Sequence, residues 1–261
     1  MKKNARSLGR QERIVQLLAQ AQTVSVAELA EQLNVSGWTV RRDLGALEAR
    51  GLLERRYGEA QLRASYRPPT GPAAEGADAQ AAKRRIGGAA ARLVGNGQHL
   101  ALSAGTTTRE VARALRERDL PCFVVTNALN IASELAPARS VRVTCTGGEV
   151  DGDYNTLNGP VAERALRGHF FDLAVVGVSG LAANAGLTVD SQLNALALET
   201  MIRHAKRVVA VADRSKFGAV RFAHLAPLGA LDVLVTDERP AGELGKRLAE
   251  HGVEVVVAEG P

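Results

Sequence analysis

Apolar residues near the start of the chain recur at the three- and four-residue spacing of amphipathic helices. Ile14 and Leu18 predict a first helix. Ser25 followed by Glu28 is the pattern of a capping box, which predicts that a second helix begins at this serine. A third helix is predicted to begin after Ser36. Its expected inward-facing residues are Val40, Leu44 and Leu47.

Strand-like residues and then a break in the pattern follow the third helix. Residues 52–62 have the character of a β-hairpin, and helices followed by such a hairpin predict a winged helix-turn-helix. Residues 67–76 hold three prolines and two glycines, which cannot continue a helix or a central strand. The expected boundaries are a winged helix-turn-helix at 8–63 (helix-turn-helix at about 27–46), a linker at 64–82 and a larger domain at 83–258.

Short apolar runs alternate with helical stretches in the larger domain. The runs are 100–102, 123–125, 141–144, 173–178, 208–212, 233–235 and 253–257. Such alternation predicts an α/β domain with a largely parallel sheet. Because open sheets of this kind bind ligands at the carboxyl ends of their strands, the loops there are the candidate binding site.

Composition and charge narrow the class of protein. With 46% apolar and 23% charged residues the chain is neither disordered nor fibrous. Residues 1–63 hold eleven Lys/Arg against seven Asp/Glu, so the excess positive charge lies in the domain expected to meet a polyanion. Cys122 and Cys145 are too few for a disulfide framework or a zinc site, and we expect both to be buried free thiols. Without an 18-residue apolar run or a signal peptide, we expect a soluble cytoplasmic protein with no cofactor or metal.

The third helix carries the candidate DNA-reading residues. Hydroxyls at Ser36 and Thr39 lie where a helix N-terminus holds phosphate, and Arg41 or Arg42 can reach a guanine edge in the major groove. Trp38 either touches the DNA or packs against the second helix. The alternative is a solvated basic face on a protein-interaction module. The candidate DNA-binding residues are Ser36, Trp38, Thr39, Arg41, Arg42, Arg55 and Arg56, of which the last two lie on the wing.

Residues 10–62 resemble the DNA-binding domain of the DeoR family of bacterial repressors. The family pattern V-S-x-x-T-I/V-R-R-D-L is matched from Val35 to Leu44, and its later glycine and wing arginine are matched by Gly51 and Arg55. The wing departs from the family, because Glu59 stands where the second glycine of Gly-Gly-Ala is usual. This negative charge is expected to lower DNA affinity or to change the hairpin turn.

Four loops of the larger domain form the candidate effector site. The segment 101–108 joins a strand to a helix through small and hydroxyl residues, which suits a phosphate. The alternative is an ordinary capped turn between a strand and a helix. Loops at 125–127, 146–149 and 212–218 add an amide, two glycines and a cation. The candidate effector-binding residues are Ser103, Gly105, Thr106, Thr107, Thr108, Asn127, Gly147, Gly148 and Lys216.

These loops resemble the DeoR-family effector domain, whose motifs are D-x-G-S/T-T, V-T-N, G-G and A/T-D-x-S-K-F-G, and whose fold is similar to ribose-5-phosphate isomerase. The resemblance implies a repressor of a carbohydrate operon, controlled by a phosphorylated sugar or a related metabolite. We also expect a homo-oligomer, because one recognition helix reads too few base pairs. Ser103 replaces the family aspartate, and Asn194 and Leu198 replace the usual glutamate and lysine of the helix before residue 201. These losses argue against an enzyme, because a general base must be titratable.

Two alternatives stay open at the level of sequence. One is a sugar-phosphate isomerase fused to a helix-turn-helix, and the other is a constitutive DNA-binding protein whose second domain only oligomerises. The first needs an acid/base pair in the pocket, and the second predicts that no phosphorylated metabolite changes DNA binding.

Overall fold

The computed structural model divides the 261-residue chain into two compact units, Met1–Ala74 and Glu75–Pro261. The structure describes residues 10, 11, 13, 14, 17, 18, 23–49, 53–56, 58–62, 77–152 and 154–259. Each unit is described by itself. No helix within these described ranges is long and apolar enough to cross a membrane.

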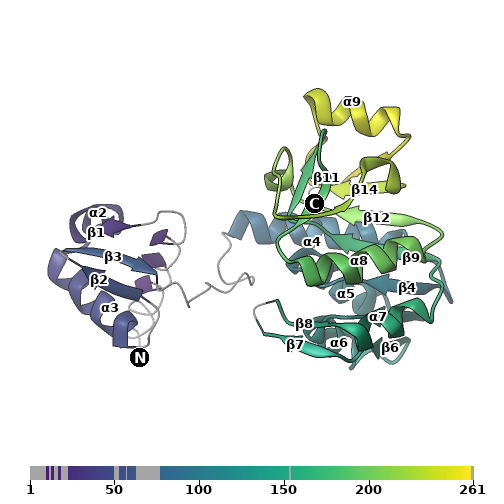
Figure 1. Cartoon of the computed structure of the whole chain (residues 1–261), viewed down its shortest axis with the longest axis horizontal. Coiled ribbons are helices and arrows are strands. Elements are labelled where there is room, and N and C mark those ends of the chain that lie inside the picture. The colour runs from purple at the N-terminus through teal and green to yellow at the C-terminus, as the bar shows by residue number, and fades with distance from the viewer. Residues whose placement is uncertain are drawn as a thin grey trace. The chain divides into compact units, whose positions relative to one another are not determined.

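The first unit packs helices against a small antiparallel sheet (Figure 1). The described residues between 10 and 18 are helical. The elements that follow are β1 (Val24–Ser25), α2 (Val26–Gln32), α3 (Gly37–Ala49), β2 (Leu53–Arg56) and β3 (Glu59–Leu62). The strands pair in the order β1-β3-β2, so the hairpin β2–β3 is the wing of a winged helix-turn-helix.

Two local interactions explain why these residues fold as predicted. The capping box is confirmed, because the Glu28 backbone N–H donates to Ser25 Oγ at 3.2 Å and the Ser25 N–H donates to the Glu28 carboxylate at 2.8 Å. Asp43 faces inward on α3, and Arg10 Nε donates to its Oδ2 at 2.5 Å. The core around them consists of Ile14, Leu18, Val24, Leu29, Val40, Leu44, Leu47, Leu53 and Ala60.

The second unit is built on a seven-stranded sheet whose neighbouring strands are all parallel. The strands are β4 (His99–Leu102), β5 (Cys122–Thr126), β6 (Val141–Cys145), β9 (Leu173–Gly177), β12 (Val208–Val211), β14 (Val233–Thr236) and β15 (Glu254–Val257). Their spatial order is β15-β14-β12-β9-β4-β5-β6. Each coincides with a predicted apolar run, which confirms the α/β class.

Helices cover both faces of this sheet (Figure 1). They are α4 (Ala77–Arg92), α5 (Thr106–Arg118), α6 (Leu129–Leu135), α7 (Pro160–Arg167), α8 (Gln192–Arg203) and α9 (Gly242–Glu250). Helices α4, α5 and α6 share one core with Leu100 and Leu102, whereas α7 and α8 pack with Ala101 on the opposite face. Alternate strand residues therefore face opposite layers, as expected for a sheet that is buried on both sides.

Smaller elements were absent from the sequence-based prediction. They are the hairpin β7 (Glu149–Asp151) and β8 (Thr156–Asn158), the strands β10 (Gly180–Ala182), β11 (Gly186–Val189) and β13 (Ala223–Ala226), and the 3-10 turns η2 (Arg214–Lys216) and η3 (Leu228–Ala230). Strands of three or four residues show too little alternation to be recognised.

Two sequence-based expectations differ from the structure. Helix α4 begins at Ala77, inside the segment expected to be a linker, because the Ala-rich residues after Gly76 favour a helix once the prolines have ended. Cys122 is buried as expected, but Cys145 is exposed because it ends β6, the edge strand of the sheet.

Candidate DNA-binding and effector sites

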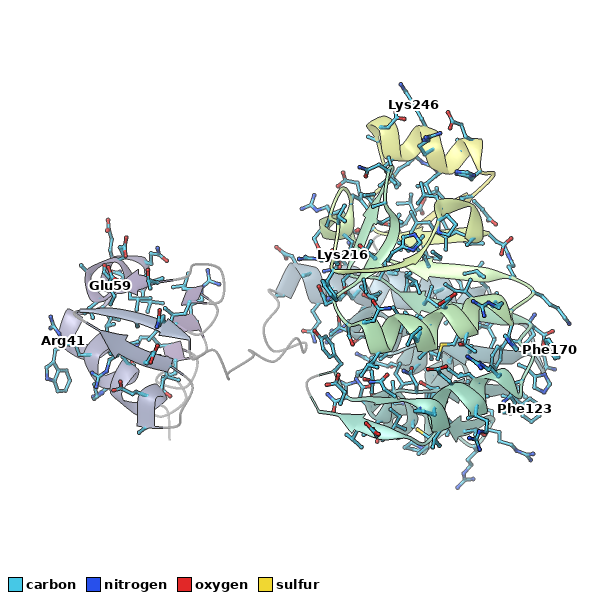
Figure 2. All side chains as sticks on the ribbon, viewed as in Figure 1. Arg41, Glu59, Phe123, Phe170, Lys216 and Lys246 are labelled. Atoms are coloured by element: carbon cyan, nitrogen blue, oxygen red, sulfur yellow. The ribbon has the colours of Figure 1, made fainter. Side chains whose placement is uncertain are left out.

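The exposed face of α3 carries the residues predicted to bind DNA. Ser36 Oγ accepts a hydrogen bond from the Thr39 backbone N–H at 3.3 Å and lies 3.0 Å from the Thr39 hydroxyl oxygen. The two hydroxyls thus lie at the helix N-terminus, where unpaired amides favour an anion. Arg41 and Arg42 are both exposed, and Figure 2 shows Arg41 projecting outward from α3.

Trp38 also lies on this exposed face. Its side chain is 66% exposed, which does not fit the alternative that it packs against α2. The Arg42 guanidinium carbon lies 5.1 Å from the centroid of the indole ring, a cation–π contact. The ring therefore orients Arg42 on the surface and leaves Arg41 as the less restrained of the two guanidinium groups.

The wing is fixed to α3 through Arg55. Its Nε donates to Glu48 Oε2 at 2.7 Å, and its backbone N–H donates to Glu48 Oε1 at 3.3 Å. Arg56 pairs in register with Glu59 across the hairpin. The hairpin turn keeps a glycine with positive φ, Gly58 at +88°, whereas Glu59 takes a strand position open to any residue. The departure from the family pattern therefore leaves the turn glycine in place.

The effector loops meet at one edge of the parallel sheet. The chain runs outward from β4 to β5 and β6, and then returns to β9 on the other side of β4. The gap between β4 and β9 is thus a topological switch point, where open α/β sheets bind ligands. Loops after β4, β5, β6 and β12 all begin at this edge, because parallel strands end on the same side.

Ser103 connects the two strands at the switch point. Its Oγ accepts a hydrogen bond from the Gly177 N–H at 3.0 Å and donates to the Ala104 carbonyl at 3.2 Å. The residue is fully buried. The structure thus gives this hydroxyl a role in joining β4 to β9, and its proton is already used within the protein.

The N-terminus of α5 is the segment predicted from the sequence to hold an anion. Gly105 is the N-cap residue with φ +148°, and no side chain caps the amides of the first turn, Thr106 to Thr108. The Thr108 hydroxyl instead donates to the Gly105 carbonyl at 3.0 Å. Amides of a first turn have no acceptor within their own helix, so they are available to bind an anion.

Lys83, on α4, lies beside this candidate site and was not among the residues predicted from the sequence. Its side chain is only 4% exposed, and its Nζ donates to Thr106 Oγ1 at 2.7 Å. A signal existed, because Lys83 stands three residues before Ile86 and seven before Ala90, on the buried face of the helix. Because the expected linker ended at residue 82, the turn of α4 that precedes Lys83 was not recognised as helical.

Asp213 is a buried carboxylate on which the charges of Lys83 and Lys216 act. It is 6% exposed, and its Oδ1 accepts a hydrogen bond from the Ser215 N–H at 2.9 Å. Burial raises the pKa of Asp213, but hydrogen bonding to Ser215 and the positive charges of Lys216 and Lys83 outweigh burial and hold the pKa below its ordinary value. The carboxylate therefore stays ionised and balances part of the lysine charge.

Other residues predicted to bind the effector lie in the loops that follow β5 and β6. Asn127 is fully buried; its Nδ2 donates to the Leu157 carbonyl at 3.5 Å, and its Oδ1 has no hydrogen-bond partner among the described residues. Gly147 and Gly148 have φ of +72° and +117°, and a Cβ on Gly148 would lie 2.4 Å from the Asn158 carbonyl oxygen. The glycine pair thus lets this loop pack against β8.

The positions that replace the family acid and base do not form a titratable pair. Leu198 is fully buried in the apolar core, and Asn194, near the start of α8, donates its backbone N–H to the N-cap residue Ser191. In the part of the chain that the structure describes, no three His, Cys, Asp or Glu residues gather as a metal site would require. The arrangement suits binding of an anion rather than proton transfer.

Comparisons with known proteins agree for both units. Residues 10–65 match the family model of the DeoR-like helix-turn-helix domain, and residues 78–238 match that of the DeoR C terminal sensor domain. The HTH-type transcriptional regulator GlpR of Haloferax volcanii is 35% identical, over 95% of this chain and 96% of its own. The HTH-type transcriptional repressor GlcR of Bacillus subtilis is 30% identical, over 94% of each chain.

Two further similarities are more distant. The glycerol-3-phosphate regulon repressor of Escherichia coli K12 is 28% identical, over 93% of this chain and 95% of its own. Among solved structures, ribose 5-phosphate isomerase A of Methanocaldococcus jannaschii matches with a TM-score of 0.38 and 17% identity, over 52% of this chain and 53% of its own.

Proposed function

Because the chain belongs to the DeoR family of transcriptional regulators, we propose that it represses a carbohydrate-metabolism operon and that a phosphorylated sugar controls its binding to DNA. Its family domains imply DNA binding by the first unit and a small-molecule effector for the second. It is a regulator rather than an enzyme, as its relatives are.

The observation that carries the choice of effector is the anion cradle at the switch point. Uncapped amides at the start of α5 lie beside a buried lysine, and the loop after β12 supplies Lys216. Such a set favours a phosphate group, which accepts charge-assisted hydrogen bonds from amides and ammonium groups alike. The name of the glycerol-3-phosphate regulon repressor supports a phosphate ester as the class of effector.

On DNA, the first unit is proposed to dock α3 in the major groove. Ser36 and Thr39 hold backbone phosphate, Arg41 reads a base, and Trp38 with Arg42 contacts the groove wall. Arg55 acts by fixing the wing, and Arg56 contacts the DNA backbone. One recognition helix reads few base pairs, so we expect a homo-oligomer that binds paired half-sites in the cytoplasm.

Ligand-induced stabilisation tests the effector class. The thermal-unfolding midpoint of the full chain is measured with glucose 6-phosphate, fructose 6-phosphate, ribose 5-phosphate and glycerol 3-phosphate, each paired with its unphosphorylated counterpart. At 100 times its Kd, a true effector stabilises by about 2.7 kcal/mol, which is a readily measured shift. At least one phosphorylated compound is expected to raise the midpoint while its counterpart does not. Equal or absent shifts throughout would reject a phosphorylated sugar.

A further inference from the structure

The burial of Lys83 calls for an explanation. Lysines are seldom fully buried, because removing an ammonium group from water is costly unless it is paired. Here the ammonium group donates to the hydroxyl of Thr106, the first residue of α5, and its charge acts on the buried Asp213. The lysine is thus held at the mouth of the anion cradle rather than at the protein surface.

Positive groups gather at this edge of the sheet. Lys83 and Lys216 both lower the pKa of Asp213, so the charges of both ammonium groups act on this buried carboxylate. The first-turn amides of α5 add partial positive charge at the same place. A phosphate monoester carries a charge of about −1.5 to −2 at neutral pH, which positive groups of this kind attract.

Helix α4 also connects this site to the rest of the chain. It is the first described element after the DNA-binding unit, and Lys83 lies in its second turn. A Cβ on Gly87 would lie 2.5 Å from the backbone carbonyl carbon of Glu110, so α4 and α5 touch backbone to backbone. Because the two backbones are in contact, a shift at the start of α5 must also displace α4.

We propose that Lys83 binds the phosphate of the effector and is the residue through which occupancy of the site reaches the DNA-binding unit. The proposal rests on the function proposed above. In the structure the ammonium group donates a hydrogen bond to the Thr106 hydroxyl. A phosphate oxygen replaces this hydroxyl as acceptor when the effector binds, and α4 changes its position. The effector then favours one of two states of the chain, as allosteric coupling requires.

The test compares Lys83→Met with Lys216→Met and a matched control, Lys246→Met, in the full chain. Lys246 is exposed on α9, far along the chain from the site (Figure 2). Thermal shift reports binding of inorganic phosphate and of whichever sugar phosphate stabilises the wild type. Fluorescence anisotropy on a labelled duplex from the chain's own upstream region reports DNA affinity with and without that sugar phosphate.

Lys83→Met is expected to weaken phosphate binding by at least about tenfold, the loss of a hydrogen bond to a charged group, and to abolish the change in DNA affinity. Lys216→Met is expected to weaken binding but to keep the full DNA response at saturation. Lys246→Met is expected to behave as the wild type.

Two results would overturn the proposal. One is Lys83→Met binding phosphate as tightly as Lys246→Met, and the other is a full DNA response of Lys83→Met at saturating ligand. If no sugar phosphate stabilises or affects the wild type, the function proposed above fails instead. A second variant, Gly87→Ala, tests the proposal in case Lys83→Met fails to fold. It keeps Lys83, but its Cβ forces α4 away from α5. It is expected to retain phosphate binding and to lose most of the DNA response; an unchanged response would also contradict the proposal.

Discussion

At the residue scale, the structure separates side chains that serve a ligand from side chains that serve the fold. Ser103 uses its hydroxyl to join β4 and β9, and Leu198 fills the core where the family carries a lysine. Lys83, in contrast, is a charged residue on the buried face of α4, where the other buried residues are apolar. Residue type alone therefore did not decide which residues belong to the site.

Arg41 is predicted to read a base, because its guanidinium is exposed and is not stacked on Trp38. Arg41→Ala is expected to lower specific binding by about 1–3 kcal/mol and to leave binding to random DNA nearly unchanged. Anisotropy on both duplexes at one salt concentration measures this, with the exposed Arg139→Ala as a charge-matched control. Equal losses on both duplexes would mean that Arg41 contacts only phosphate.

Gly148 is predicted to be required for its backbone conformation and close packing. Gly148→Ala places a Cβ 2.4 Å from the Asn158 carbonyl oxygen at a φ of +117°, so it is expected to destabilise the second unit by about 1–3 kcal/mol. Gly152→Ala is the matched control, because a Cβ there meets nothing within 4 Å. The thermal-unfolding midpoint measures both; equal midpoints would contradict the packing described here.

Asp213 predicts a dependence of stability on pH. Its pKa is held below the ordinary value, so the ionised carboxylate stabilises the fold at neutral pH, and this contribution is lost as the pH falls through the folded-state pKa. Asp213→Asn is therefore expected to be less stable than the wild type at pH 7 and to approach it below about pH 4. Denaturant unfolding between pH 3 and 7 measures the difference. A difference that stays constant over this pH range would contradict the assignment.

At the scale of elements, the long periodic segments were predictable and the short ones were not. Seven apolar runs became the seven strands of the parallel sheet, since a strand buried on both faces is marked by consecutive apolar residues. The hairpin β7–β8 and the start of α4 at Ala77 were not predicted. Short strands and Ala-rich helical turns show little periodicity of apolar and polar residues. The candidate anion site at Thr106 could be predicted from the residues of its loop. The place of Lys83 beside it could not, because it depends on a contact between α4 and α5.

The capping box of α2 is predicted to stabilise the first unit. Ser25→Ala removes the acceptor of the Glu28 N–H, and it is expected to lower the free energy of unfolding of this unit by about 0.5–2 kcal/mol. Thr23→Ala, an exposed position just before β1, is the control and should have little effect. Denaturant unfolding followed by Trp38 fluorescence isolates this unit, because the chain has one tryptophan. Identical midpoints for the two variants would contradict the role of the cap.

At the scale of the whole molecule, the protein combines a DNA-reading unit with a sensor unit whose candidate site lies at the switch point of its sheet. Paired half-sites require paired recognition helices, so light scattering of the full chain is expected to give at least twice the chain mass of 27.5 kDa. A monomer at the concentrations that saturate DNA would contradict this expectation.

Control of DNA binding by a phosphorylated sugar is tested most directly by anisotropy of the full chain on its own upstream DNA. The salt concentration is fixed, because phosphate contacts make affinity strongly dependent on salt. At least one sugar phosphate is expected to change the Kd for this duplex by about 5- to 150-fold, while its unphosphorylated counterpart leaves it unchanged. Tight DNA binding that no phosphorylated compound alters would contradict the account and identify a constitutive DNA-binding protein.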